Sequence, residues 1–129
     1  MVLSEFKDLE RKLDRLVKEP ENPQLYHEIG VMLYEAGDFQ NAEMYLHRAY
    51  ELTPLDKDIL YNYASLFYFQ SEFLKDIPLY QACLQLEPDN QDIIEKVADS
   101  YYQTGEYESA AKYMDYLQNP GKAGPLHER

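Results

Sequence analysis

The sequence predicts an all-α fold of three consecutive helix-turn-helix repeats, preceded by one extra helix. The main observation is that residues of the same chemical kind recur at a spacing of 34 positions. Ile29, Tyr63 and Val97 form one such apolar series, and Pro54 recurs as Pro88. A second observation is that each 34-residue stretch holds two segments with a helical apolar period, separated by a short turn. Since a hairpin of helices buries its apolar side only against a neighbour, this pattern is typical of a stacked array.

The first predicted helix covers residues 4–18, within an N-terminal segment that extends over residues 1–19. One apolar stripe runs along it at steps of three and four residues, formed by Phe6, Leu9, Leu13 and Leu16. Ser4 is placed to cap its start, and the prolines at positions 20 and 23 end it. Two roles are compatible with this helix: a cap that packs on the first repeat, or a detachable arm that occupies a groove of the array.

The first repeat is predicted at residues 23–56. Asn22 is expected to cap a helix that runs from Pro23 to about Ala36. Gly37 supplies the turn, because glycine adopts a left-handed conformation at little cost. A second helix then runs over residues 39–52.

The second repeat, residues 57–90, departs from this pattern. Ser71 stands where the other repeats have a turn glycine, and Asp76 stands where they have alanine. A carboxylate buried at a tight helix crossing is costly. We therefore expect Asp76 to cap a late-starting helix with Pro78 in its first turn, and residues 71–75 to form a longer loop.

The third repeat is predicted at residues 91–118, with a cap at Asn90, a turn at Gly105 and a second helix from about Tyr107 to Leu117. Residues 119–129 are expected to form a flexible tail, because their prolines and glycines disfavour helix. No further helix is then predicted to cover the last hairpin. The side chains expected to be partly exposed there, and available for self-association, are Tyr113, Met114, Tyr116 and Leu117. The alternative explanation for the missing covering helix is that the chain is a piece of a longer protein.

Composition narrows the range of partners. The 129 residues carry a formal net charge of −12, and residues 20–118 hold 18 acids against five bases. A nucleic-acid partner is not expected, because phosphates require clustered cations, whereas basic or apolar protein segments are favoured. Acidity that serves solubility alone is the other interpretation. The sequence contains no membrane span and no secretory leader, so we expect no membrane partner. Its one cysteine, Cys83, is predicted to lie in the core, and we expect a cytoplasmic protein.

Catalysis is not predicted. The three histidines, His27, His47 and His127, occupy unrelated positions, and no nucleophile–base spacing, phosphate loop or metal motif is present in the sequence. We expect neither a cofactor nor a metal site.

The repeats resemble the tetratricopeptide repeat over residues 23–118. The signature positions are occupied in the first repeat by Tyr26, Ile29, Gly30, Leu33, Gly37, Phe39, Ala42, Leu46, Ala49 and Pro54. The resemblance implies a right-handed α-solenoid whose first helices line a concave, peptide-binding groove. The residues that it places in this groove are His27, Glu28, Val31, Tyr34, Tyr61, Asn62, Ser65, Tyr68, Phe69, Glu95, Lys96, Asp99 and Tyr102.

Tyr34, Tyr68 and Tyr102 lie in phase, so the resemblance implies a tyrosine ladder along the groove. Tyrosine has a rigid apolar ring with a hydrogen-bonding tip, which suits the capture of an extended peptide. Acids outnumber bases around it, which favours a peptide with apolar anchors and a basic residue. The alternative is that the tyrosines only pack between neighbouring helices.

The resemblance implies a non-enzymatic adaptor or chaperone-like protein that binds an extended, apolar and basic segment of a partner. A more specific variant is a bacterial secretion chaperone, since the chain is similar to that class in being small and acidic, with three repeats and an extra N-terminal helix. The alternatives are an assembly module that forms homo-oligomers through its last repeat, and a regulatory domain of a larger enzyme.

Overall fold

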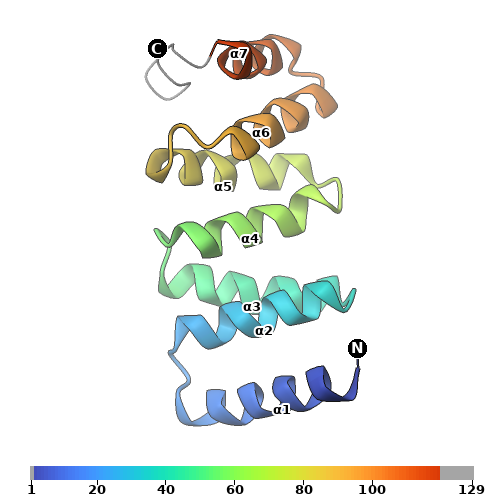
Figure 1. Ribbon diagram of the computed structural model, residues 1–129, viewed down its shortest axis with the longest axis vertical. Helices are drawn as coiled ribbons and strands as arrows, with labels where there is room; N and C mark the ends of the chain where they lie inside the picture. Colours follow the sequence, from blue (N-terminus) through green and yellow to red (C-terminus); the bar gives the residue numbers. More distant parts are fainter. Residues whose placement is uncertain (1, 120–129) are drawn as a thin grey trace. The chain divides into compact units, whose positions relative to one another are not determined.

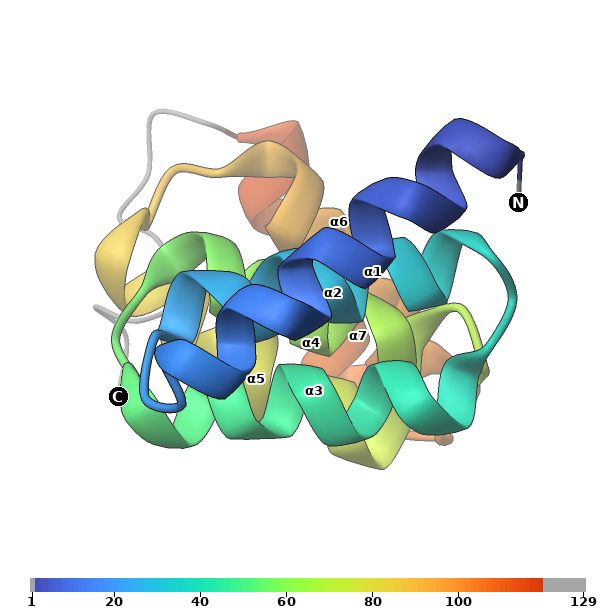
Figure 2. The same ribbon diagram turned by 90° about the horizontal axis from the view of Figure 1, so that it is seen from below.

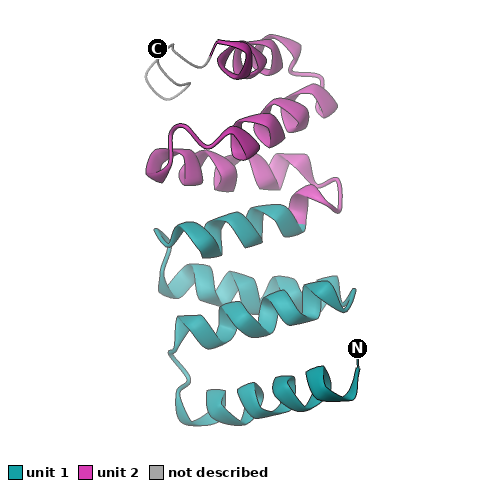
Figure 3. Cartoon of the chain, in the orientation of Figure 1, with its two compact units in different colours: residues 1–66 teal, residues 67–129 magenta. Residues whose placement is uncertain are grey.

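The computed structural model describes residues 2–119, which form seven α-helices and no strand (Figure 1). The helices are α1 (Leu3–Lys18), α2 (Pro23–Glu35), α3 (Phe39–Leu52), α4 (Lys57–Tyr68), α5 (Phe73–Leu86), α6 (Gln91–Gln103) and α7 (Tyr107–Gln118). The chain divides into two compact units, residues 1–66 and 67–129, with the boundary inside α4 (Figure 3). The predicted tail lies outside the described residues from position 120 onward. The division into three repeats stays a prediction.

Unit 1 is built on the hairpin of α2 and α3. Its core is formed by fully buried side chains that include Leu25, Ile29, Leu46 and Ala49. Helix α1 lies against α2 (Figure 2), and the Nζ atom of Lys12 lies 3.4 Å from a carboxylate oxygen of Glu28. No residue of α1 is buried, so the apolar stripe of this helix is only partly covered. Its role as a cap or as an arm stays a prediction.

Unit 2 contains α5, α6 and α7, with α6 in contact with both other helices. The buried core includes Tyr80 and Leu84 of α5 and Val97 of α6. Cys83 is also buried, as predicted from its small apolar position in the repeat. Within residues 2–119, no helix is both long enough and apolar enough to cross a membrane.

Most of the predicted helix starts are confirmed. The side chain of Asn22 accepts hydrogen bonds from the backbone N–H groups of residues 24 and 25 in α2, and the side chain of Asn90 accepts one from the backbone N–H of Ile93 in α6. The Asp56 carboxylate caps α4 through the backbone N–H groups of residues 58 and 59. The prediction for Ser4 was wrong, because α1 starts at Leu3 and its N-cap residue, Val2, makes no side-chain capping bond.

The predicted late start of the second helix in the second repeat is also wrong. Helix α5 begins at Phe73 and continues through Pro78, with Asp76 inside it and completely buried. The burial is tolerated because the Ser100 hydroxyl of α6 lies 2.8 and 2.9 Å from the two carboxylate oxygens of Asp76. Desolvation raises the pKa of Asp76 to about 7, an effect that the Ser100 hydrogen bond opposes and that the nearby charge of Asp99 increases. The carboxyl group can therefore keep its proton near neutral pH.

The turn between α4 and α5 carries a strained residue. Ser71 has a φ of 60°, and the glycines of the two regular turns, Gly37 and Gly105, have φ values of 85° and 84°. The left-handed conformation costs a residue with a Cβ roughly 1–2 kcal/mol more than it costs glycine. Ser71 is exposed, so its side chain contributes little packing that would offset this cost.

We expect Ser71→Gly to stabilise the protein by about 0.5–1 kcal/mol. Relief of the left-handed strain outweighs the extra backbone entropy that glycine brings to the unfolded chain. Urea unfolding followed by circular dichroism measures the change, with Gly37→Ala as the reciprocal control that should destabilise. A lower free energy of unfolding in the Ser71→Gly protein would contradict this account.

Candidate functional site

Unit 2 contains a cavity of about 780 Å³ between α6 and α7, bounded on one side by the last residue of α4. Its lining residues are Tyr68, Glu95, Ala98, Asp99, Tyr102, Tyr107, Ala110, Ala111 and Met114. The floor contains small alanine side chains, the walls are aromatic, and the charged groups among these lining residues are both carboxylates. A site of this kind can accept apolar side chains next to a cation.

Tyr68 forms a fixed wall of the cavity. Its hydroxyl donates a hydrogen bond of 2.6 Å to the Asp99 carboxylate. Its ring packs edge-on against Phe73 and Tyr80 of α5, at centroid distances of 5.9 and 6.1 Å. Desolvation, followed by the hydrogen bond to Asp99, raises the pKa of the Tyr68 hydroxyl. Tyr68 is therefore partly a packing residue, as the alternative interpretation of the tyrosines proposed.

Tyr102 is more accessible than Tyr68. It is 60% exposed and packs edge-on against Tyr107, which is 63% exposed, with 5.3 Å between the ring centroids. Two exposed aromatic rings in contact offer a large apolar surface that loses little side-chain entropy on binding. Tyr102 is therefore the predicted groove tyrosine that is best placed to contact a partner directly.

Lys96 and Phe69 also lie against Tyr68. The ammonium group of Lys96 lies 2.7 Å from a carboxylate oxygen of Asp92 and 5.6 Å from the centre of the Tyr68 ring. Phe69 is 63% exposed, and its ring contacts Tyr68 edge-on at 5.1 Å. Both were predicted as groove residues, and both lie next to the Tyr68 ring.

Four of the predicted groove residues of unit 1 line a smaller cavity of about 220 Å³. It is lined by Val31, Tyr34, Glu35, Leu46, Asn62 and Ser65. Ser65 is buried and Tyr34 is half-buried. The ring of Tyr34 packs against Phe39, with the centroids 5.6 Å apart.

His27 is buried in unit 1 rather than exposed in a groove. Its Nε2 atom lies 2.7 Å from the side-chain amide nitrogen of Asn62 on α4. Burial lowers the pKa of His27, while the carboxylates of Asp56 and Asp58 act in the opposite direction. His27 therefore acts as a neutral link between α2 and α4. Tyr61 is half-buried on α4, and Glu28 is half-buried beside α1.

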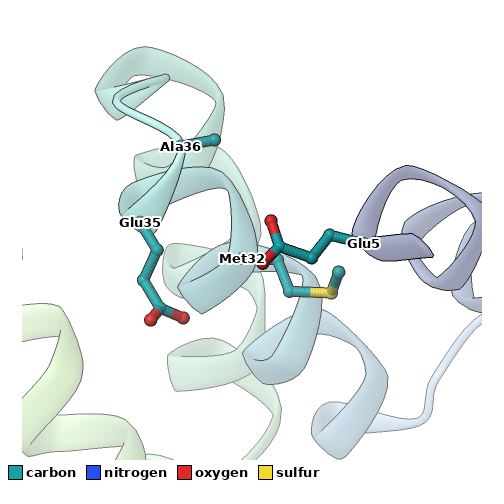
Figure 4. Close-up of a pocket in the computed structure, with 4 residues that line it drawn as sticks. All are labelled: Glu5, Met32, Glu35 and Ala36. Carbon is teal, nitrogen blue, oxygen red and sulfur yellow. The ribbon is translucent and has the colours of Figure 1, made fainter. Parts of the chain in front are cut away.

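A third cavity, of about 360 Å³, lies where α1 meets the C-terminal end of α2 (Figure 4). Glu5, Met32, Glu35 and Ala36 line it, and Figure 4 shows the Glu5 side chain directed from α1 toward Met32. Two of its four lining residues are carboxylates, against two of nine in unit 2, so this cavity is the more polar one.

The tyrosine ladder stays a prediction as a whole. Tyr34 belongs to unit 1, whereas Tyr68 and Tyr102 belong to unit 2. Within unit 2, Tyr68 and Tyr102 line the same cavity together with the predicted acids Glu95 and Asp99. The structure therefore brings four of the predicted groove residues together at one site.

The predicted self-association surface needs correction. Tyr113 and Tyr116 are buried, at 6% and 4% exposure, rather than exposed at the end of the last hairpin. Tyr113 faces the other helices of unit 2: its hydroxyl accepts a hydrogen bond from Gln81 of α5, and its ring contacts Tyr101 of α6. Leu117 is half-buried, and Met114 is exposed but lines the cavity of unit 2.

The contribution of α7 to the cavity was missed from the sequence. From the sequence, Tyr107 was assigned only to the start of the last helix, and Ala110 and Ala111 were assigned to no site, because the family resemblance draws groove residues from the first helix of each repeat. A signal was available, since Tyr107, Ala110, Ala111 and Met114 follow the three- and four-residue steps that define one helix face. Within residues 2–119, no group of three or more His, Cys, Asp or Glu side chains is arranged to hold a metal ion.

Comparison with known proteins supports the helical-repeat fold. The tetratricopeptide repeat family model matches residues 23–54, and no curated protein matches the sequence. Similar solved structures include a MamA protein with 19% identity and a TM-score of 0.81, over 89% of this chain and 63% of that chain. MamA from Desulfovibrio magneticus RS-1 gives 16% identity and a TM-score of 0.83, over 92% and 67% of the two chains. The solved structure of MamA AMB-1 has 19% identity and a TM-score of 0.79, over 94% of this chain and 68% of that chain.

This chain therefore spans only about two thirds of the length of these structures, and less than that of the first. At such low identity the likeness shows the fold alone, and it confirms the predicted all-α fold class; the number of repeats stays a prediction. Residues 23–54 match the tetratricopeptide repeat itself, and the all-α fold of the chain is that of the solved structures similar to it.

Proposed function

We propose that this chain is a non-enzymatic protein-interaction module that captures a partner segment combining apolar side chains with a basic residue. The tetratricopeptide fold supports the general role of a protein-binding scaffold. The observation that carries the finer proposal is the cavity of unit 2, where exposed tyrosine rings lie next to two carboxylates.

The chemistry of the cavity favours a mixed apolar and basic ligand. Tyr102 and Tyr107 can cover the aliphatic part of a lysine or arginine side chain, and a cation above an aromatic ring is itself stabilised. Glu95 is exposed at the rim, and Asp99 is held in place by Tyr68. An acidic ligand would meet repulsion from both carboxylates, so charge should set the specificity of the site.

The family resemblance further implies that the segment is extended, and it also places groove residues in unit 1. The accessible candidates there are Val31, Tyr34 and Glu28, which are half-buried in the unit. His27 and Ser65 are buried and support the surrounding helices instead. Assembly through the last helix has less support, because Tyr113 and Tyr116 are not exposed.

Three matched peptides that differ only in one central residue test the proposal. Each carries the same tyrosine and leucine anchors, with lysine, glutamine or glutamate at the centre, and binding is followed by fluorescence anisotropy. We expect the lysine peptide to bind the full chain about three- to tenfold more tightly than the glutamine peptide, and the glutamate peptide to bind most weakly.

A charge reversal in the protein supplies the control. Glu95→Lys should invert the order of the three peptides, whereas Glu10→Lys, an exposed position on α1, should leave it unchanged. Equal affinity of all three peptides, or an order that Glu95→Lys does not alter, would rule out the acidic cavity as the recognition site.

A further inference from the structure

Two parallel stripes of side chains form the cavity of unit 2. On α6 the stripe consists of Glu95, Ala98, Asp99 and Tyr102, and on α7 of Tyr107, Ala110, Ala111 and Met114. Both stripes follow the steps of three and four residues that place side chains on one helix face. Each covers two helical turns, so together they make a trough roughly 10 Å long.

In unit 1, the trough of the corresponding hairpin is occupied by a third helix. Consecutive residues of α4 contact both helices of the hairpin: Asn62 lies 2.7 Å from His27 of α2, and the Tyr63 hydroxyl lies 2.9 Å from Nδ1 of His47 on α3. Neighbouring residues on the same helix, Leu60 and Ala64, are completely buried. Helix α4 therefore shows what kind of element such a hairpin accepts.

The two troughs correspond position by position. Two steps of the 34-residue spacing take His27 to Glu95 and Val31 to Asp99. The same steps take Tyr34 to Tyr102 and Leu46 to Met114. Val31, Tyr34 and Leu46 line the small cavity beside α4, and their counterparts line the large cavity of unit 2. Among the described helices, α7 is the last, and the position corresponding to α4 is the cavity itself.

The chemistry of the two troughs differs at one place. Where unit 1 has His27 and Val31, unit 2 has two carboxylates, Glu95 and Asp99. In unit 1 the occupant, α4, places the side-chain amide of Asn62 against His27. An occupant of the trough in unit 2 would need a cation at the same point, because it would meet the Glu95 carboxylate there.

We propose that the cavity between α6 and α7 takes an amphipathic α-helix of a partner protein, with an apolar face toward the alanine floor and a lysine or arginine facing Glu95. This deepens the proposed function and rests on it, and it replaces the extended segment implied by the family resemblance. The floor of Ala98, Ala110 and Ala111 allows close approach of a second helix axis. Methyl groups offer an extended backbone no hydrogen-bond partners, whereas a helix satisfies its own backbone groups.

A synthetic helix based on α4 tests this inference. The probe carries the sequence of residues 56–69 with Asn62→Lys, in a linear form and in a form held helical by a staple joining positions 57 and 61. Both forms are titrated against the full chain by fluorescence anisotropy. A site for a helix should bind the stapled form at least tenfold more tightly, because the cost of ordering the free peptide is removed.

Matched variants locate the binding. Met114→Glu, inside the cavity, should lower the affinity for the stapled probe tenfold or more. Leu74→Glu, at a position on α5 that is 78% exposed, should change that affinity less than twofold. Circular dichroism checks that both variants are folded. Absence of binding by the stapled probe, equal or tighter binding of the linear form, or indifference to Met114→Glu would each overturn the inference.

These outcomes separate the inference from the proposed function. If the stapled probe fails while the matched peptides still depend on Glu95, the site binds a basic segment that is not a helix. If the stapled probe fails and the matched peptides do not depend on Glu95, both the inference and the proposed function are wrong.

Discussion

Asp76→Asn should remove the part of the protein's pH-dependent stability that arises from the buried carboxyl group in α5. The folded pKa of Asp76 is about 7, against an ordinary value of 3.8. A difference of about three pKa units corresponds to a stability change on the order of 4 kcal/mol. No other carboxyl group described here is completely buried.

The direction follows from proton linkage. Below pH 4 the carboxyl group is protonated in both the folded and the unfolded chain, so ionisation costs nothing. Between pH 4 and pH 7 the unfolded chain ionises freely while the folded chain keeps its proton, and stability falls as pH rises. Above pH 7 both states are ionised and the loss is complete. The wild-type protein should therefore lose up to this amount relative to Asp76→Asn as pH rises from 4 to 7.

Urea unfolding of both proteins at half-unit pH intervals measures the difference between their free energies of unfolding. Because the two proteins share every other carboxyl group, the contributions of those groups cancel in this difference. Ser100→Ala is an informative companion, because it removes the hydrogen bond that favours the ionised form and should steepen the loss. A wild-type minus Asp76→Asn difference that stays constant between pH 4 and 7 would show that Asp76 does not titrate abnormally.

Tyr102→Ala should weaken binding of the lysine-containing partner segment by about 1–3 kcal/mol, or roughly 5- to 150-fold, the range found for aromatic anchors. The residue is 60% exposed in the free protein, so its replacement should cost little stability. Titration with the lysine peptide measures the loss. Leu55→Ala, at a position on the α3–α4 connection that is 75% exposed, is the control that should bind normally. A folded Tyr102→Ala protein with unchanged affinity would remove Tyr102 from the binding site.

Tyr68→Ala is a less direct test of the same site. Its hydroxyl bonds Asp99 and its ring packs on Phe73 and Tyr80, so the substitution also loosens the wall of the cavity. We expect Tyr68→Ala to lower both affinity and the free energy of unfolding, whereas Tyr102→Ala should lower affinity alone.

The helices and turns could be predicted from the sequence because their signals are local. Asn22 and Asn90 cap the helices that follow them, and Gly37 and Gly105 adopt the left-handed turns that the spacing indicated. These features depend on a few neighbouring residues, so the chain itself carries the information.

What the sequence did not reveal depends on residues that are distant along the chain. Asp76 lies inside a helix because Ser100, on another helix, supplies its hydrogen bond. Tyr113 is buried because Gln81 and Tyr101 face it from two different helices. Likewise, the cavity joins residues of α6 with residues of α7 that the family resemblance did not indicate. Helical periodicity identifies a face, but it does not say which neighbour covers it.

The bond between Asp76 and Ser100 limits how freely the hairpins can be exchanged in protein engineering. The spacing of the sequence aligns Asp76 with Ala42 and Ala110, and Ser100 with Met32 and Leu66, so this polar pair has apolar counterparts in the rest of the chain. A graft that moved α5 without α6 would leave a carboxyl group facing a methionine or a leucine in a dry interior. Chimaeras that keep these two helices together should fold, and those that separate them should need alanine in place of the aspartate.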